Sequence, residues 1–147
     1  MRLIKMRPKV KIKIEEGGIP PFKKYPDDVG YDLYLVNLIE KKDNLYFYDT
    51  KVRVEPPEGY YIEIVPRSSL SKTGYVMANS IGIIDPQYRG TIKVALRKVN
   101  ENAPDLELPF RGVQMILRKL HLFDIDIVDN LSETERQEGG FGSTGIK

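Results

Sequence analysis

Residues Leu45 to Val54 read LYFYDTKVRV, and this stretch decides the fold class. Apolar side chains recur at every second residue, which is the period of a β-strand with one buried face. Because no helical period of 3.6 residues is sustained, the sequence predicts an all-β protein with one short helical turn at Ser68 to Lys72. Five further stretches show the two-residue pattern: KVKIKI (Lys9 to Ile14), LYLV (Leu33 to Val36), YYIEIV (Tyr60 to Val65), TIKVAL (Thr91 to Leu96) and VQMILRKLHLFDIDIV (Val113 to Val128).

The connections between these stretches are rich in turn-forming residues. Sequences such as EEGGIPP, KKDN, EPPEG, DPQYRG and NENAPD separate one predicted strand from the next. Many short strands joined by frequent turns are typical of a β-sandwich or β-barrel. We find no internal repeat and no domain boundary ahead of the C-terminal stretch ERQEGGFGSTGIK. Its glycines and small polar residues predict a mobile segment from Glu135 to Lys147.

Composition indicates one globular domain without a marked charge preference. The chain has 147 residues and a net charge of +2, which does not favour a nucleic-acid or membrane partner. Cysteine is absent, so disulfides and thiolate metal sites are excluded, and the single histidine, His121, argues against a histidine-based metal site or a Ser-His triad. No signal peptide or spanning segment is recognisable. We therefore expect a soluble protein of the cytoplasm, or of the nucleus if its source is eukaryotic or viral.

The segment VPRSSL places an arginine and two serines directly after a predicted strand. The guanidinium fork of Arg67 matches phosphate oxygens, and the hydroxyl groups of Ser68 and Ser69 add further donors. The alternative is an exposed helix cap beside a solvated arginine. The residues alone leave both interpretations open.

The segment ANSIGIIDPQYRG, from Ala78 to Gly90, is the most informative for function. A hairpin with a glycine inside it would let a flat ligand approach the backbone, whose N–H and C=O groups could bind the edge of a base. The carboxylate of Asp85 beside such a slot could orient or deprotonate a water molecule. The alternative, which the residues alone favour, is a structural Asp-Pro turn with Tyr88 packed against it.

Four polar residues stand within otherwise apolar strand patterns: Asp32, Lys93, Arg111 and Gln114. A carboxylate such as Asp32 among apolar neighbours is either paired structurally or functional. A buried Gln114 must be hydrogen-bonded, which marks a network or a ligand contact. Lys93 is most simply a solvated strand residue, although its side chain could reach a phosphate.

Five stretches, taken in order, resemble the five motifs of the trimeric dUTPases, the deoxyuridine triphosphate nucleotidohydrolases. The resemblance implies a jelly-roll-like β-domain over residues 1–134, a mobile lid over residues 135–147, and a homotrimer with active sites shared between subunits. It also implies magnesium-dependent hydrolysis of dUTP to dUMP and pyrophosphate, which keeps uracil out of DNA and supplies dUMP for dTMP synthesis. The five stretches are VGYDLY (Val29 to Tyr34), PRSSL (Pro66 to Leu70), GIIDPQYRGTI (Gly82 to Ile92), RGVQMI (Arg111 to Ile116) and RQEGGFGSTG (Arg136 to Gly145).

The resemblance also implies roles for individual residues. Asp85 matches the carboxylate that activates the water attacking the α-phosphorus, and Tyr88 matches a ring that packs on deoxyribose and excludes a 2′-hydroxyl group. Asp32 and Arg111 match a supporting network. Mg²⁺ is implied to be held mainly by triphosphate oxygens and water, without direct protein ligands. Substrate contacts are implied at Asn79, Gly82, Ile83 and Ile84 for uracil, at Arg67, Ser68, Ser69 and Gln114 for the phosphates, at Lys93, and at Arg136, Phe141, Gly142, Ser143 and Thr144 in the tail.

Four residues, at three places in the chain, depart from the family pattern. Ser69 and Gln137 each replace a common glycine, and Pro109 with Phe110 replaces a Gly-Asp pair. Two other functions remain as alternatives, a dCTP deaminase on the same fold and a regulatory nucleotide-binding protein that has lost turnover. The segment IIDPQYRG favours the dUTPase over the deaminase, and the presence of Asp85 and Phe141 favours an enzyme over a regulator.

Overall fold

The computed structural model describes residues 6–143, and these fold into two antiparallel β-sheets. No helix in this range is long and apolar enough to cross a membrane. The predicted fold class, an all-β sandwich of the jelly-roll type with a Gly-rich C-terminal segment, is confirmed. The elements are β1 (Lys11–Ile14), β2 (Tyr31–Leu35), β3 (Asn37–Lys42), β4 (Leu45–Glu55), β5 (Tyr60–Pro66), the 3-10 helix η1 (Ser68–Lys72), β6 (Tyr75–Met77), β7 (Gly82–Ile84), β8 (Thr91–Lys98) and β9 (Phe110–Lys119).

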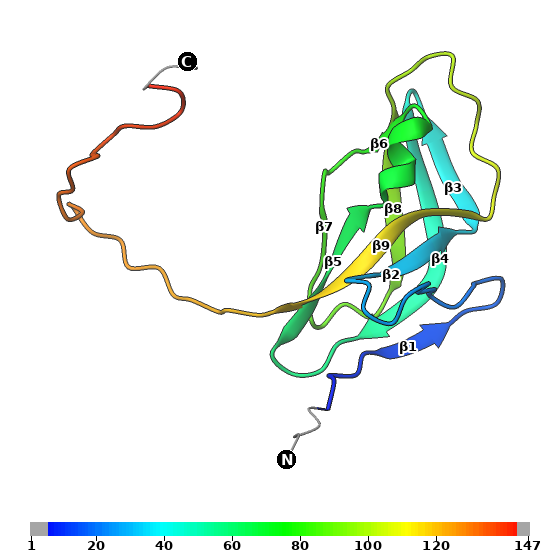
Figure 1. Ribbon diagram of the computed structural model, residues 1–147, viewed down its shortest axis with the longest axis horizontal. Coiled ribbons are helices and arrows are strands. Elements are labelled where there is room, and N and C mark those ends of the chain that lie inside the picture. The colour runs from blue at the N-terminus through cyan, green and yellow to red at the C-terminus, as the bar shows by residue number, and fades with distance from the viewer. Residues whose placement is uncertain (1–5, 144–147) are drawn as a thin grey trace.

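The two sheets face each other as layers (Figure 1). One has the order β1–β4–β8–β6, with β3 pairing along the first half of β4, and the other has the order β2–β9–β5–β7. Inward-facing residues of both sheets form one core, in which Ile62 and Ile64 of β5 and Val94 and Leu96 of β8 are almost fully buried. The strict alternation along β5 and β8 is therefore the signature of a sheet with one face in the core.

Strand β4 is the stretch whose alternation decided the fold class, and it carries a bulge at its centre. Its register against β8 shifts between Asp49 and Arg53, and Lys51 has a φ of 59°. The Thr50 hydroxyl, fully buried, donates to the Ile92 carbonyl at 2.7 Å and accepts from the Val52 N–H at 3.2 Å. These bonds satisfy polar groups that the bulge removes from the ladder, so the strand can bend without leaving buried donors unpaired.

The sequence predicted the central elements well and the edges poorly. Strands β4, β5 and β8 lie within two residues of the predicted stretches, and η1 has the predicted bounds. Strands β3 and β6 carried no recognised pattern. All of β3 is exposed, so burial on one face does not impose an alternation there.

The strand predicted from Val113 to Val128 is wrong in its second half. β9 ends at Lys119, and the next residue makes the last ladder-like bond, from the Leu120 N–H to the Gly59 carbonyl at 2.8 Å. Beyond it the chain runs away from the sandwich as an extended arm, residues 121–131 (Figure 1). Its alternation has the period of a strand, but a strand needs a hydrogen-bonding neighbour, and none of the described strands pairs with it.

The buried Tyr75 side chain predicts that the folded protein loses stability at high pH. Burial, reinforced by the neighbouring Tyr46 and Asp105, raises the pKa of Tyr75 to about 12, and burial also raises the pKa of Tyr48. An unfolded tyrosine ionises near pH 10, so this stabilisation is complete below about pH 10 and is lost as the pH rises toward 12. We expect the urea midpoint of unfolding to be flat from pH 8 to 10 and to fall above it. Tyr75→Phe should make that fall shallower, and an unchanged slope would contradict the assignment.

Candidate active site

The Asp32 carboxylate lies between two arginine side chains. Asp32 is on β2, Arg67 follows β5 and Arg111 is on β9, so the pairing order β2–β9–β5 brings them together. Asp32 Oδ2 is 3.2 Å from Arg67 Nε and 3.5 Å from Arg111 Nε, and all three side chains are partly buried. Two positive charges share one negative charge, which leaves one positive charge in excess. The cluster is therefore suited to an anionic ligand such as a phosphate.

Arg67 is held by further hydrogen bonds. Its Nη1 donates to the Arg111 carbonyl at 2.7 Å and to Ser69 Oγ at 3.3 Å, and its backbone N–H donates to the Gly112 carbonyl at 3.0 Å. Its side chain makes no capping bond to η1, which begins at Ser68. The arginine is thus tied to β9 rather than solvated beside a helix cap. The predicted phosphate-binding residues Arg67, Ser68 and Ser69 therefore lie at the Asp32 cluster.

Gln114 joins the same cluster. It lies directly opposite Asp32 in the β2–β9 pairing, and its Nε2 donates to the Pro66 carbonyl at 3.3 Å. A Cβ atom on Gly30 would come within 2.7 Å of Gln114 Oε1, so the glycine makes room for this amide. Gln114 is thus partly buried and hydrogen-bonded to the residue before Arg67, and its predicted contact with the phosphates stays a prediction.

Phe22 is a residue of this cluster that the sequence did not indicate. Its ring lies under the Arg111 guanidinium, with 4.8 Å between the ring centroid and Cζ. Its backbone also forms both bonds of an isolated bridge to Asp32, at 2.9 and 2.6 Å. A single aromatic residue in the turn sequence EEGGIPPFKK has no periodic signal. Only the bridge to β2 places it beneath Arg111.

A hairpin was predicted within the segment Ala78 to Gly90, with its uracil-binding part from Asn79 to Asp85. This prediction is wrong, because the strands on the two sides of the turn belong to different sheets. β6 pairs with β8 and β7 pairs with β5, so the segment crosses the edge of the sandwich. The crossing is a tight turn in which the Ile81 N–H donates to the Asn79 carbonyl at 2.6 Å and Ser80 has a φ of 61°. Apolar side chains on both sides enter the common core, which favours a crossing over a flat two-stranded ribbon.

The crossing leaves β7 as an edge strand. Gly82, Ile83 and Ile84 pair with β5 on one side, and no described strand pairs with the other. The Asn79 side-chain amide lies near Gly82, 3.7 Å from where a Cβ would stand. The outward N–H and C=O groups of an edge strand can bind a planar base as they would bind another strand. This geometry fits the predicted uracil contacts.

Asp85 and Tyr88 follow β7 in a compact turn. The Tyr88 N–H donates to the Asp85 carbonyl at 3.0 Å, and the Tyr88 hydroxyl donates to the Thr91 carbonyl at 2.8 Å. The Asp85 residue is exposed, and within residues 6–143 its carboxylate takes part in no ion pair or hydrogen bond. Lys93 lies on β8 of the other sheet, exposed and opposite Asp49. It is therefore not brought into the Asp32 cluster.

The Asp32 cluster and the Asp85 turn lie at opposite ends of β5. Ile84 is paired with Ile62, so Asp85 is adjacent to the start of β5, whereas Arg67 follows its last residue. Continuing this register sets Asp85 beside Tyr61, and from there to Arg67 is roughly 20 Å at about 3.3 Å per residue. Within one chain, the two predicted halves of the site are therefore far apart.

The tail residues lie apart from both halves. Arg136 and Gly139 form one local turn, and Gly140 and Ser143 form a second through bonds of 2.8 and 2.9 Å. The Phe141 side chain is fully exposed. Gly142 lies in the second turn with a φ of 81°, and Thr144 lies outside the described residues. Nothing in the described chain brings these residues onto the sandwich (Figure 1).

Comparison with known proteins identifies the family. Residues 17–145 match the sequence profile of the dUTPase family. The deoxyuridine 5'-triphosphate nucleotidohydrolase of Hydrogenobaculum sp. (strain Y04AAS1) is 36% identical over 138 residues, covering 92% of this chain and 96% of that protein. The corresponding enzyme of Escherichia phage T5 is 46% identical over 100 residues, covering 67% of this chain and 68% of that protein.

A solved structure shows the same fold. The dUTPase of Staphylococcus bacteriophage 80alpha, determined with dUpNHpp, superposes with a TM-score of 0.77 at 22% identity, covering 94% of this chain and 99% of that chain. The two antiparallel β-sheets of this chain therefore form the same fold as a solved dUTPase. The chain belongs to the dUTPase family. The predicted family and the predicted enzyme class, a dUTP diphosphatase, are confirmed.

We expect the aromatic ring of Phe22 to contribute to dUTP binding by positioning the Arg111 guanidinium. Phe22→Leu removes the contact with the Arg111 guanidinium and should raise KM for dUTP by about three- to tenfold, the range expected of a partly buried cation–π contact. Phe22→Tyr keeps the ring and serves as the matched control, with KM expected near wild type. Steady-state pyrophosphate release measures both. Equal behaviour of the two variants would show that the ring does not position Arg111.

Proposed function

We propose that this protein hydrolyses dUTP to dUMP and pyrophosphate at a site built from the Asp32 cluster and the Asp85 turn. The observation that carries the proposal is the pair of arginines on one carboxylate, formed by three of the family-like stretches. The excess positive charge of this cluster suits a triphosphate. It would stabilise the negative charge that develops on the phosphate oxygens as the pyrophosphate leaves. The family relationship supports the same substrate.

The edge of β7 would select the base. Uracil and cytosine differ at one edge of the base: where uracil carries a hydrogen-bond donor, cytosine carries an acceptor, and the reverse. Backbone groups of Gly82, Ile83 and Ile84 have fixed positions because β5 holds the strand. The wrong base would leave buried groups unpaired, which discriminates more strongly than shape alone.

Asp85 would act as the general base. Its exposed carboxylate accepts a proton from a water molecule, whose oxygen attacks the α-phosphorus. The bond from the α-phosphorus to the bridging oxygen breaks, and pyrophosphate leaves with that oxygen. Arg67 and Arg111 would bind the phosphate oxygens on which charge develops.

Magnesium fits this arrangement as a companion of the triphosphate. Mg²⁺ takes oxygen ligands and keeps several waters, and when bound it would neutralise phosphate charge. Asp32 faces two guanidinium groups, which disfavours a cation beside it. The Asp85 carboxylate is exposed and would hold a magnesium-bound water by a hydrogen bond.

We further propose a homotrimer whose active sites are shared between subunits. Asp85 must act within a few ångström of the phosphates that Arg67 binds, because general-base catalysis requires hydrogen-bonding distance. The separation of the two groups along β5 is far larger within one chain. A site completed by the Arg67 of one subunit and the Asp85 of another satisfies both requirements.

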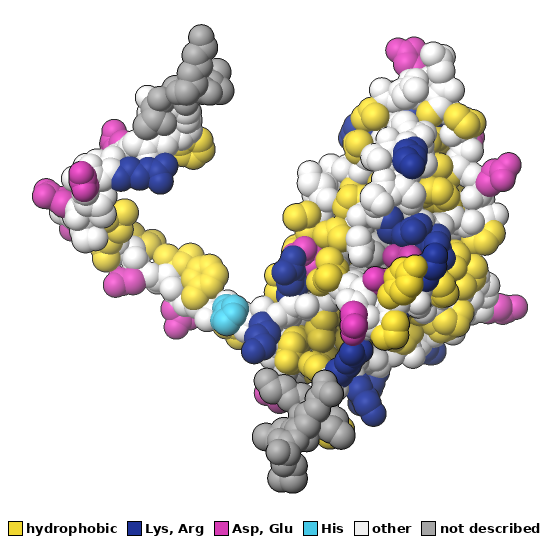
Figure 2. Space-filling view, in the orientation of Figure 1, with side chains coloured by type: hydrophobic (Ala, Val, Ile, Leu, Met, Phe, Trp, Pro, Cys, Tyr) yellow, Lys and Arg dark blue, Asp and Glu magenta, His cyan; other side chains and the backbone are white. Residues whose placement is uncertain are grey.

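The extended arm supports such an assembly. Leu122, Phe123, Ile125 and Ile127 are each at least 80% exposed, a large apolar surface for one chain. Phe123, Ile125 and Ile127 share one face of an extended strand, and Asp124 and Asp126 lie on the other. Hydrophobic and acidic side chains follow one another along the arm (Figure 2).

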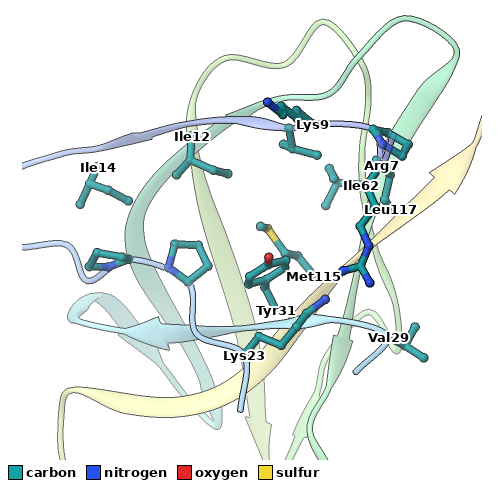
Figure 3. A pocket seen from close by; sticks show the side chains of 14 residues that line it. Arg7, Lys9, Ile12, Ile14, Lys23, Val29, Tyr31, Ile62, Met115 and Leu117 are labelled. Atoms are coloured by element: carbon teal, nitrogen blue, oxygen red, sulfur yellow. The ribbon is translucent and has the colours of Figure 1, made fainter. Parts of the chain in front are cut away.

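A cavity between β1 and the opposite sheet is a suitable acceptor for this arm. It has a volume of about 710 Å³, and the side chains of Ile12, Tyr31 and Met115 face it (Figure 3). Arg7, Lys9 and Lys23 also line it, which complements the aspartates of the arm. β1 ends its sheet, so one side of it is available to pair with a strand of a neighbouring subunit.

The tail beyond the arm would then close over the nucleotide of a neighbouring subunit. Phe141 would stack on uracil, and Arg136 with Gly142 to Thr144 would contact the phosphates. The exposure of Phe141 is what such a lid needs before substrate binds. In the cytoplasm or nucleus, this activity would keep uracil out of DNA and supply dUMP.

Asp85→Asn tests the chemistry. The amide keeps the shape but cannot accept the proton, so kcat should fall by at least about a hundredfold while dUTP binding stays within about threefold. Pyrophosphate release and calorimetric titration with a non-hydrolysable dUTP analogue measure the two. Unchanged turnover would remove Asp85 from the role of base. Ammonia release from dCTP, or binding of dUTP by wild type without turnover, would instead favour a deaminase or a regulator.

Mixing two inactive variants tests the shared site. Asp85→Asn and Arg67→Ala chains, unfolded and refolded together at equal amounts, should regain about a quarter of wild-type activity if each site draws the two residues from different subunits of a trimer. A site within one chain would regain none. A second mixture, of Asp85→Asn with chains ending at residue 134, applies the same test to the tail.

A further inference from the structure

The Tyr88 side chain is folded back over its own turn. Its hydroxyl donates to the Thr91 carbonyl at 2.8 Å, which closes a loop across Arg89 and Gly90. The ring covers the face of Gly90 where a side chain would project. A Cβ atom there would lie 2.5 Å from Tyr88 Cζ and 3.0 Å from Cε1, and closer still to Oη. No other amino acid at position 90 is compatible with this ring position.

We propose that Gly90 is a positioning residue for sugar specificity, because only a glycine lets the Tyr88 ring lie where it can meet the deoxyribose. The inference rests on the proposed function, in which Tyr88 excludes a 2′-hydroxyl group. It extends that function from the ring to the residue that sets the ring's position. A side chain at position 90 would turn the ring away and open the site to a ribonucleotide.

The backbone around Gly90 is held more firmly than the ring. Arg53 Nη1 donates to the Arg89 carbonyl at 2.7 Å, and Arg89 itself reaches the Pro86 carbonyl at 2.6 Å and Glu55 at 3.3 Å. Thr91 is buried as the first residue of β8. Tyr88, by contrast, is 39% exposed. An added methyl group would therefore displace the ring rather than the chain.

A Gly90→Ala substitution should affect the Tyr88 ring without straining the backbone. Its φ lies outside the left-handed region that favours glycine, so an alanine carries no backbone strain there. The steric effect is directed at one side chain. Its consequence should be a change in the choice between dUTP and UTP, not a general loss of folding.

The test compares kcat/KM for dUTP and UTP in the full-length protein. Gly90→Ala should raise the UTP-to-dUTP ratio of kcat/KM by about tenfold, the range for a small steric difference in a pocket. Tyr88→Leu should raise the ratio by at least as much. In the Tyr88→Leu background, Gly90→Ala should change it by less than about twofold, because the ring it displaces is gone. Gln87→Ala, an exposed change in the same turn, should leave the ratio at the wild-type value.

Each outcome of these measurements supports or contradicts the role proposed for Gly90. An unchanged ratio in a normally folded Gly90→Ala protein, or independent effects in the double variant, would overturn the role of Gly90. If Gly90→Ala does not fold, the double variant Gly90→Ala with Tyr88→Leu decides: removing the ring removes the collision, so this protein should fold and keep the ratio of Tyr88→Leu within about twofold, whereas a double variant that also fails to fold would overturn the proposal. Absence of dUTP hydrolysis in the wild-type protein would overturn the proposed function instead.

Discussion

The pairing of β5 with β9 on one side and β7 on the other is the constraint on which the site depends. It sets the Asp32 cluster at one end of the strand and the Asp85 turn at the other. Antiparallel hydrogen bonds fix this register, and a slip by one residue would turn the buried isoleucines of β5 outward. The distance between the two halves is thus as rigid as the core itself.

The charge balance of the Asp32 cluster follows from the same sheet. Strands β2 and β9 and the residue after β5 contribute one carboxylate and two guanidinium groups, and the partial burial of all three limits screening by solvent. The Phe22 ring against Arg111, and the bonds from Arg67 Nη1 to the Arg111 carbonyl and Ser69 Oγ, restrict how the two guanidinium groups can move. The arginines are therefore largely oriented before a ligand binds, which reduces the cost of ordering them later.

Local pattern predicted the elements that pack against the core, because burial on one face imposes a period of two on β4, β5 and β8. It did not predict β3, which is exposed, β6, which packs in the core but has only three residues, or the point where β9 ends. The arm from residue 121 to 131 keeps the strand period although it has no partner in the described chain. A two-residue period in the sequence indicates that a segment can form a β-strand. It does not indicate which strand that segment will pair with.

The sequence by itself determined the fold class, the family and most residues of the candidate site. The reason is that the spacing of residues within a motif is local, so it can be recognised before the three-dimensional structure is known. Only the tertiary structure placed Phe22 under Arg111 and the Tyr88 ring over Gly90. It also placed β6 and β7, the strands on either side of residues 78–81, in different sheets instead of a hairpin. The Tyr88 contact depends on the turn between β7 and β8, whereas the position of Phe22 and the assignment of β6 and β7 to different sheets depend on which strands become neighbours. That choice is made by the packing of the whole core, which no single stretch of sequence contains.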